Sequence, residues 1–168
     1  MAFFRIKKIK EKDYMYLVEN SWKKKGSRQK VKNYLGRAYR IELKNNIDFV
    51  DYYKIENLQR YIEDNDKNKI ITDLIEWELF KFDIRNNGYQ FDPEGVKVLK
   101  KKRDVVLMVN DGYFCSLTLG NLVNFKAEGD EQIDGYRLAR AFVEAGIKVP
   151  QEVFIALFGK LYKQNDAS

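Results

Sequence analysis

The sequence contains no histidine, one cysteine and two prolines among its 168 residues. Without histidine, the chain lacks the base of Ser-His-Asp and Cys-His catalysis, the imidazole ligand of many zinc sites and the usual pH switch. The single Cys115 excludes an internal disulfide and any site built from several cysteines. Because its neighbours in GYFCSL are apolar, we expect Cys115 to be a buried structural thiol.

Long apolar runs and nucleotide-binding motifs are also missing. No run approaches the roughly 18 residues that a membrane-spanning helix requires, and MAFFRIKKIK lacks the apolar region of a signal peptide. We therefore expect no membrane partner and a cytoplasmic location. The glycines are scattered singly, and no GxxxxGK[ST], GxGxxG or GxSxG motif occurs. We predict no catalytic residue, no metal ligand and no cofactor.

What the sequence does have is positive charge concentrated at one end. Residues 1–44 hold 14 Lys or Arg and 4 Asp or Glu, a net charge of +10. The remaining residues hold 17 bases and 21 acids, a net charge of −4. A basic segment joined to a mildly acidic remainder is typical of proteins that bind a polyanion, most often nucleic acid. The pattern does not separate DNA from RNA.

The hydrophobic pattern predicts an α+β fold in two parts. Residues 1–44 interleave basic, aromatic and β-branched residues between polar turns, which favours an antiparallel sheet of three or four strands. Residues 45–168 are predicted to form a mainly helical body with a small β hairpin around 84–110.

Within the body, apolar residues at three- and four-residue spacing predict helices over 45–66 and 67–83. Farther along the chain, Asp130 is a predicted N-cap, and Gly146 is a predicted stop after the helix that Asp130 begins. We expect the last residues, 164–168, to fray.

A face for binding is predicted in the segment RQKVKNYL. Period-two alternation places Arg28, Lys30, Lys32 and Tyr34 on one side of this strand. Lys and Arg neutralise phosphates, and tyrosine rings stack on unpaired bases. A solvated sheet or a protein-docking face is the alternative interpretation. The predicted nucleic-acid-binding residues are Arg5, Lys7, Arg28, Lys30, Lys32, Tyr34 and Arg37.

A second basic cluster lies in the body, at Lys97 and residues 100–103. It could extend the binding surface of residues 1–44. Consecutive lysines point in several directions, however, so we interpret the cluster as a loop.

Two other function classes are kept as alternatives. The acidic, aromatic body could be a protein-interaction or oligomerisation module that docks a partner or a second copy. A metal-dependent nuclease would use an Asp followed by Glu-x-Lys, for which Asp13 and the tripeptide from Glu42 to Lys44 are candidates. The acids Asp73, Glu76 and Glu78 alternate with apolar residues and are expected to form a solvated helix stripe.

One segment resembles a known type of leader. In RIKKIKEKDYMYLVENSWKKKGSRQKVKNYLGR, a basic strand precedes Tyr-x-Tyr-Leu-Val-Glu, a lysine- and glycine-containing turn, and Arg-Gln-Lys-x-x-x-Tyr-Leu-Gly. This pattern is similar to the β-rich leaders of some insertion-sequence transposases and archaeal Fic-domain proteins. The resemblance covers about 35 of the 168 residues and implies DNA contact by Arg28, Lys30, Lys32 and Tyr34.

The rest of the chain departs from both families. The body is too short for a transposase core, and the Fic motif needs a histidine, which is missing. The expectation is therefore a leader without its enzyme, in a stand-alone archaeal or viral domain.

Overall fold

The fold is α+β, as predicted, in a computed structural model that describes residues 1–166. Within these residues, seven strands form one mixed sheet in the order β1-β2-β3-β6-β5-β4, with β7 paired to β6. The strands are β1 (Ala2–Ile9), β2 (Lys12–Lys23), β3 (Gly26–Arg40), β4 (Gln90–Asp92), β5 (Lys97–Lys100), β6 (Arg103–Val109) and β7 (Gly112–Phe114). The helices are α1 (Phe49–Tyr53), α2 (Leu58–Asp64), α3 (Lys67–Lys81), α4 (Ser116–Val123), α5 (Glu131–Glu144) and α6 (Gln151–Asp166).

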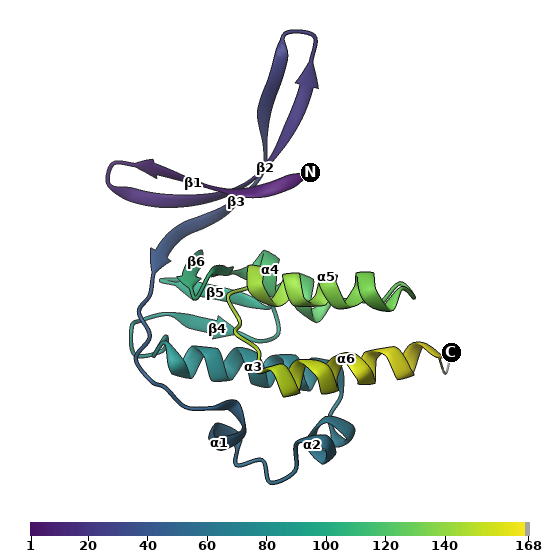
Figure 1. Cartoon of the computed structure of the whole chain (residues 1–168). Coiled ribbons are helices and arrows are strands. Elements are labelled where there is room, and N and C mark those ends of the chain that lie inside the picture. The colour runs from purple at the N-terminus through teal and green to yellow at the C-terminus, as the bar shows by residue number, and fades with distance from the viewer. Residues whose placement is uncertain (167–168) are drawn as a thin grey trace.

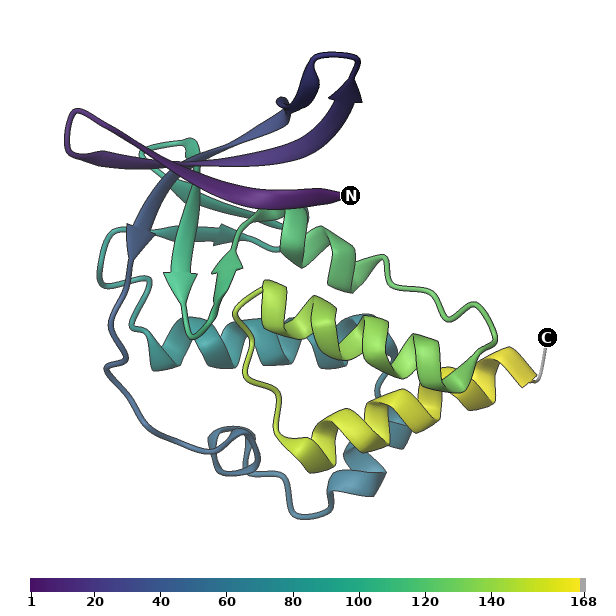
Figure 2. The same ribbon diagram turned by 45° about the horizontal axis from the view of Figure 1, so that its top comes forward.

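The N-terminal strands form the predicted antiparallel meander, β1-β2-β3. The possible fourth strand is the continuation of β3, which runs past Gly36 to Arg40. This second half of β3 pairs in parallel with β6, from Arg37 opposite Val105 to Arg40 opposite Met108. The basic meander and the body therefore share one sheet, while the far end of the β2–β3 hairpin projects away from the helices (Figures 1 and 2).

The single helix predicted over 45–66 is wrong in length, because two short helices, α1 and α2, occupy this range. Lys54 takes a left-handed φ of 53° and ends α1. Asn57 then begins α2, where its side chain accepts a hydrogen bond from the Arg60 N–H. An asparagine favours such a cap over a helix interior, so the helical spacing is interrupted here.

The helix predicted over 67–83 is confirmed as α3, which lies at the centre of the main core. Ile70, Ile71, Leu74 and Ile75 are all buried there. Each such side chain contributes about 1.5–3 kcal/mol through burial. Together they hold α3 between the sheet and the other helices (Figure 1).

A second, smaller core lies under the meander. Met15, Leu35 and Ala38 of the meander pack with Val106 of β6 and with Cys115, which is fully buried as predicted. This cluster fixes the base of the meander to the body. It therefore determines the direction in which the β2–β3 hairpin leaves the molecule.

The helix-end predictions in the C-terminal third are confirmed for α5. The Asp130 side chain accepts a hydrogen bond from the Ile133 N–H at 2.9 Å. Ala145 ends the helix, and Gly146 follows with a φ of 73°. Fraying was expected for residues 164–168, but the helix α6 extends to Asp166, so residues 164–166 are helical. Residues 167–168 lie outside the described residues.

Candidate nucleic-acid interface

The β2–β3 ladder shifts register twice. Each shift inserts one extra residue into β3, Lys32 at the first and Leu35 at the second, so both are β-bulges. Because side chains alternate with period two, an extra residue reverses the face that the following side chains take. The predicted placement of Arg28, Lys30, Lys32 and Tyr34 on one face is therefore wrong. Tyr34 lies on the opposite face of the strand from Arg28 and Lys30.

Tyr34 instead shares a face with two other tyrosines and with bases from β1 and β3. Its ring centroid lies 5.2 Å from that of Tyr16 and 6.4 Å from that of Tyr14. The Lys7 Nζ lies 5.0 Å from the centroid of the Tyr16 ring. In the ladder, Arg5 lies opposite Tyr16, and Arg37 lies opposite Tyr14. We call this surface the tyrosine face; it comprises Arg5, Lys7, Tyr14, Tyr16, Tyr34 and Arg37.

The other three predicted residues, Arg28, Lys30 and Lys32, lie apart from the tyrosine face. All three are exposed. The Lys32 Nζ pairs with Glu19 Oε2 at 3.5 Å, and the Arg28 carbonyl accepts a hydrogen bond from Ser21 Oγ at 3.1 Å. The predicted site residues are thus divided between two faces of one twisted sheet.

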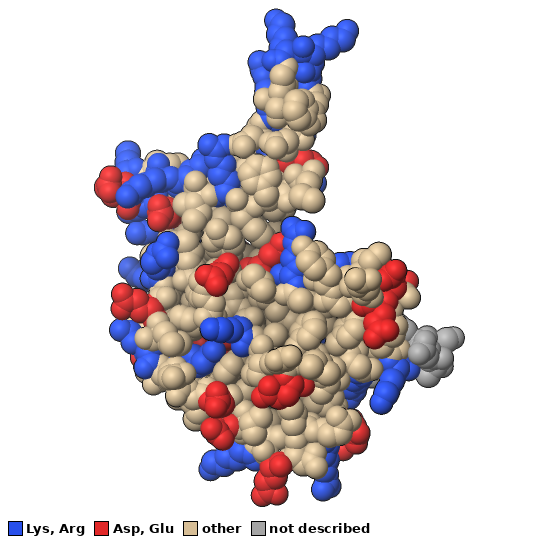
Figure 3. Space-filling model, in the orientation of Figure 1, with Lys and Arg blue, Asp and Glu red and all other residues tan. Residues whose placement is uncertain are grey.

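Beyond β1, strands β2 and β3 continue as a two-stranded ribbon of residues 20–29, which we call the arm. The pairing with β1 stops where Ala2 lies opposite Glu19. Lys and Arg side chains gather at the tip of the arm, where it projects farthest from the body (Figure 3). Trp22 at this tip is 84% exposed. Its exposed basic neighbours are Lys23, Lys24 and Lys25.

A hollow of about 1210 Å³ lies between β3, the start of β2 and the β5–β6 turn. The Tyr39 ring lies in the wall of the hollow, and two cationic side chains contact this ring. The Arg37 guanidinium carbon lies 4.7 Å from the ring centroid, and the Lys100 Nζ lies 4.5 Å from it. The hollow is therefore lined by aromatic rings and fixed positive charges, supplied by Lys12, Tyr14, Tyr34, Arg37, Tyr39, Lys100, Lys101 and Arg103.

The second basic cluster contains the predicted loop and also lines the hollow. Lys101 and Lys102 do form a turn, with φ values of 49° and 62°, as a two-residue hairpin loop requires. Yet Lys100, Lys101 and Arg103 also line the hollow beside the meander. The sequence signal for this role was the run of basic residues itself. The sequence does not reveal that β3 pairs in parallel with β6, and this pairing brings the turn beside β3.

Partial burial raises the pKa of the Tyr34 hydroxyl, and its neighbours Tyr16 and Tyr14 raise it further. Arg103 opposes this shift. The net direction is upward, so the hydroxyl stays neutral at physiological pH. A neutral phenol in a basic wall adds no negative charge that would repel a phosphate.

Most of the positive charge in the meander has no acidic partner. Across residues 1–166, ion pairs join only Lys8, Lys32 and Lys44 of the bases in residues 1–44 to a carboxylate. In the body, by contrast, ion pairs hold a larger set of bases. These are Arg60, Lys69, Lys81, Arg85, Arg137 and Arg140. The described residues thus leave most bases of both parts outside ion pairs, but residues 1–44 offset their 14 bases with only 4 acids, whereas the body offsets its 17 bases with 21 acids. The meander therefore presents a net positive charge to solvent.

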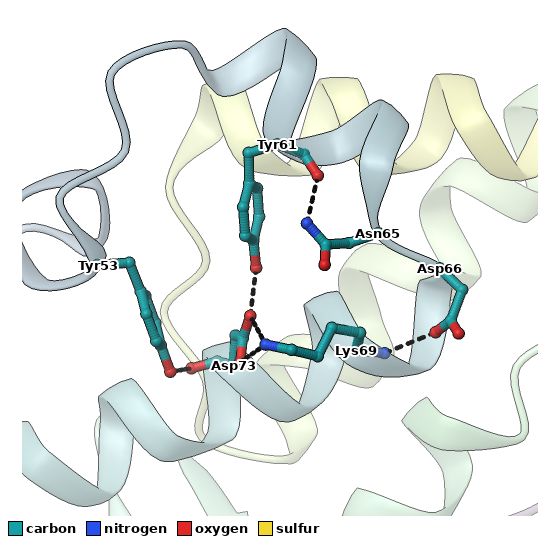
Figure 4. A network of polar contacts seen from close by, with 6 residues as sticks. All are labelled: Tyr53, Tyr61, Asn65, Asp66, Lys69 and Asp73. Carbon is teal, nitrogen blue, oxygen red and sulfur yellow. Dashed lines mark hydrogen bonds and ion pairs between the residues drawn. The ribbon is translucent and has the colours of Figure 1, made fainter.

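The acids of α3 do not form the solvated stripe that was predicted, because Asp73 is buried. Its carboxylate accepts a hydrogen bond from the Tyr61 hydroxyl at 2.6 Å and pairs with the Lys69 Nζ. The Tyr53 hydroxyl donates to the Asp73 backbone carbonyl at 2.9 Å (Figure 4). Burial, followed by the hydrogen bond to Asp73, raises the pKa of Tyr61. This network fastens α1 and α2 to α3.

Glu78 is also buried rather than solvated, at 1% exposure. Its carboxylate pairs with the Lys81 Nζ at 3.1 Å and accepts the Lys148 backbone N–H at 2.8 Å. The Lys81 Nζ lies 3.7 Å from the centroid of the Trp77 ring. Glu78 thus joins α3 to the loop between α5 and α6. The contacts of Glu78 with Lys81 and Lys148 therefore stabilise the fold.

The nuclease alternative gains no geometric support. Glu42 and Lys44 follow the end of β3 instead of lying on a strand, and they pair with each other at 3.9 Å. Asp13 lies in β2. Among the described residues, no group of three or more His, Cys, Asp or Glu side chains is placed to hold a metal ion.

Comparison with protein-family models, curated proteins and solved structures finds no match for the chain. The resemblance of residues 5–37 to transposase and Fic-protein leaders therefore stays a prediction. None of the helices in residues 1–166 is long and apolar enough to cross a membrane.

Proposed function

We propose that this protein binds nucleic acid without catalysing a reaction on it, through the basic meander and its arm. The observation that carries the proposal is the unpaired charge of residues 1–44, displayed on exposed strands beside three tyrosines. If charge served solubility alone, mixed signs would suffice. A surface of one sign interleaved with aromatic rings suits a partner that has both phosphates and bases.

Each part of the surface has a role in this proposal. Arg5, Lys7 and Arg37 on the tyrosine face contact phosphates beside the rings. Arg28 and Lys30, together with the lysines of the arm tip, neutralise phosphates on the other side of the ribbon. Each contact releases condensed counterions, so the affinity depends on salt.

Two matched variants test the proposal. The first replaces Arg5, Lys7, Arg28 and Lys30 by glutamine. The second replaces four exposed lysines of the body by glutamine, namely Lys54, Lys126, Lys148 and Lys163. Fluorescence anisotropy with labelled DNA and RNA oligomers at about 50 mM salt should show micromolar or tighter binding by the wild type. The first variant should bind at least about tenfold more weakly, and the second should lose less than about threefold. Equal losses would contradict the proposal.

A second candidate function is protein docking or self-association through the body, because α5 exposes a line of large side chains. Ile133, Tyr136 and Val143 are each more than half exposed and lie within reach of one helical face. Sedimentation velocity over a concentration series tests this candidate. Self-association should appear in the wild type and vanish in Tyr136→Asp, whereas a strict monomer counts against it.

A further inference from the structure

The hollow beside β3 has a wall chemistry that differs from that of the arm. Its cations come from two distant parts of the chain, with Lys12 and Arg37 from the meander and Lys100, Lys101 and Arg103 from the β5–β6 hairpin. Asp104 is the single acid among its lining residues. An anion that enters the hollow is therefore met by positive charge from two sides.

The aromatic rings of the hollow divide into two kinds. The Tyr39 ring already contacts two cationic side chains, because Arg37 and Lys100 lie over it. Lys100 also lies 4.7 Å from the Tyr89 ring centroid, so two rings restrain one ammonium group. These cation–π contacts fix the positive charges in place before any ligand arrives.

Tyr34 is the ring that remains accessible. Its side chain is 57% exposed, and the Tyr16 and Tyr14 rings support it at interplanar angles of 45° and 39°. A rigid, supported ring loses little freedom when a planar group stacks on it. Tyr34 is therefore a platform for a base, placed next to fixed charges that can hold a phosphate.

The body adds a further positive contribution. Ser116 and Leu117, in the first turn of α4, also line the hollow. The N-terminal turn of a helix carries partial positive charge and unpaired N–H groups. It supplements the side-chain charges that line the hollow.

The size of the hollow and its chemistry together indicate the form of the ligand. Its volume of about 1210 Å³ exceeds the roughly 300–1,000 Å³ of small-molecule sites, which suits a chain of nucleotides. In a double helix the bases are stacked on one another, and a protein ring can stack only on a base that is unpaired. Resting on the proposed function, we infer that the hollow binds single-stranded nucleic acid, with a base on Tyr34 and phosphates on Arg37, Lys100 and Arg103.

The test compares strands and ring variants in one assay. Anisotropy is measured with a labelled 20-nucleotide single strand and with the duplex of the same sequence, each as DNA and as RNA. The wild type should bind the single strand at least about tenfold more tightly than the duplex. Tyr34→Ala should lose at least about fivefold on the single strand and little on the duplex. Tyr34→Phe keeps the ring and should bind as the wild type does.

The controls separate this inference from the proposed function. Ile155→Ala removes an exposed apolar side chain from the body and should leave all affinities unchanged. Lys101→Gln should weaken binding to single strands while leaving the fold intact, because Lys101 is an exposed turn residue. Binding to the duplex that equals or exceeds binding to the single strand, or an unchanged affinity in Tyr34→Ala, would overturn the inference and leave the proposed function standing. Absence of binding to every oligomer would overturn both.

Discussion

Gly36 of β3 lies against the backbone of Asp104 at the start of β6. A Cβ on Gly36 would stand 2.5 Å from the Asp104 carbonyl oxygen, and the glycine has a φ of 124°. The contact lies where β3 leaves the meander and begins its parallel pairing with β6 at Arg37. This close approach sets the position of the meander, and with it the hollow, relative to the body.

Replacing Gly36 by alanine should therefore be costly. The strained φ and the backbone clash together predict a loss of about 3 kcal/mol or more in the free energy of unfolding. The matched control is Gly88→Ala, since Gly88 has a φ of 82° but a Cβ added there would meet no atom within 4 Å. It should lose only about 1–2 kcal/mol. Urea unfolding measures both, and equal losses would show that the contact with Asp104 is unimportant.

The buried ion pair of Lys81 and Glu78 gives a second prediction. Lys81 is 7% exposed and Glu78 is 1% exposed, so Lys81→Met leaves a buried carboxylate without its cation. We expect a loss of about 3–5 kcal/mol in the free energy of unfolding. Replacing both residues, as Lys81→Met with Glu78→Gln, should recover part of this loss.

The exposed pair of Arg60 and Asp64, with nitrogen and oxygen 3.5 Å apart, is the control for that experiment. Arg60→Met should change the free energy of unfolding by less than about 1 kcal/mol, because solvent screens the pair. If Lys81→Met costs as little as Arg60→Met, the buried pair of Lys81 and Glu78 contributes no more to stability than an exposed pair does.

The environment of the Asp134 carboxyl makes the free energy of unfolding depend on pH. Burial raises the pKa of its carboxyl, but hydrogen bonds from the Gly129 and Glu128 N–H groups and from Arg137 outweigh burial, and the net pKa is lowered. A lowered folded-state pKa contributes stability above the ordinary aspartate pKa of about 3.9 and loses it as the pH falls through the folded-state value.

The variant Asp134→Asn measures this contribution. At pH 7 it should be less stable than the wild type in urea unfolding, and the difference should shrink as the pH falls below about 4. Asp111→Asn, at an exposed turn position, should show no such difference. A deficit in Asp134→Asn that stays constant down to pH 3 would contradict the role of its charge.

The sequence predicted those parts of the fold that depend on local pattern. The periodic apolar residues of α3 and the caps of α5 follow from spacing and residue type alone. The break at Lys54 could not be predicted, because a lysine at positive φ has no distinct sequence signal. The burial of Asp73 and Glu78 was also hidden, since their partners Tyr61 and Lys148 come from other elements.

Composition indicated which segment carries the basic side chains of the candidate site. It did not indicate which face of the sheet each side chain takes. Charge counting selected Arg5, Lys7 and Arg37 as binding residues, and the structure places them as exposed or half-exposed bases of the meander. The bulge at Lys32 then reversed the alternation and moved Tyr34 to the other face. Bulges depend on pairing between strands, so a pattern read along one strand cannot locate them.

The fluorescence of Trp22 can show whether the arm contacts nucleic acid. It is 84% exposed, whereas Trp77 is 5% exposed in the core. Added nucleic acid should quench and shift the Trp22 emission if the arm takes part in binding. In Trp22→Phe, which keeps only Trp77, the emission should stay unchanged on addition of the same oligomer. A response of equal size in both proteins would place the contact away from the arm tip.

The salt dependence of wild-type binding tests the central claim most directly. Anisotropy titrations between about 50 and 200 mM salt should give a linear plot of log K against log salt concentration. We expect a slope of about −4 or steeper, as several phosphate contacts require. No binding at 50 mM salt, or an affinity that does not change with salt, would contradict the account.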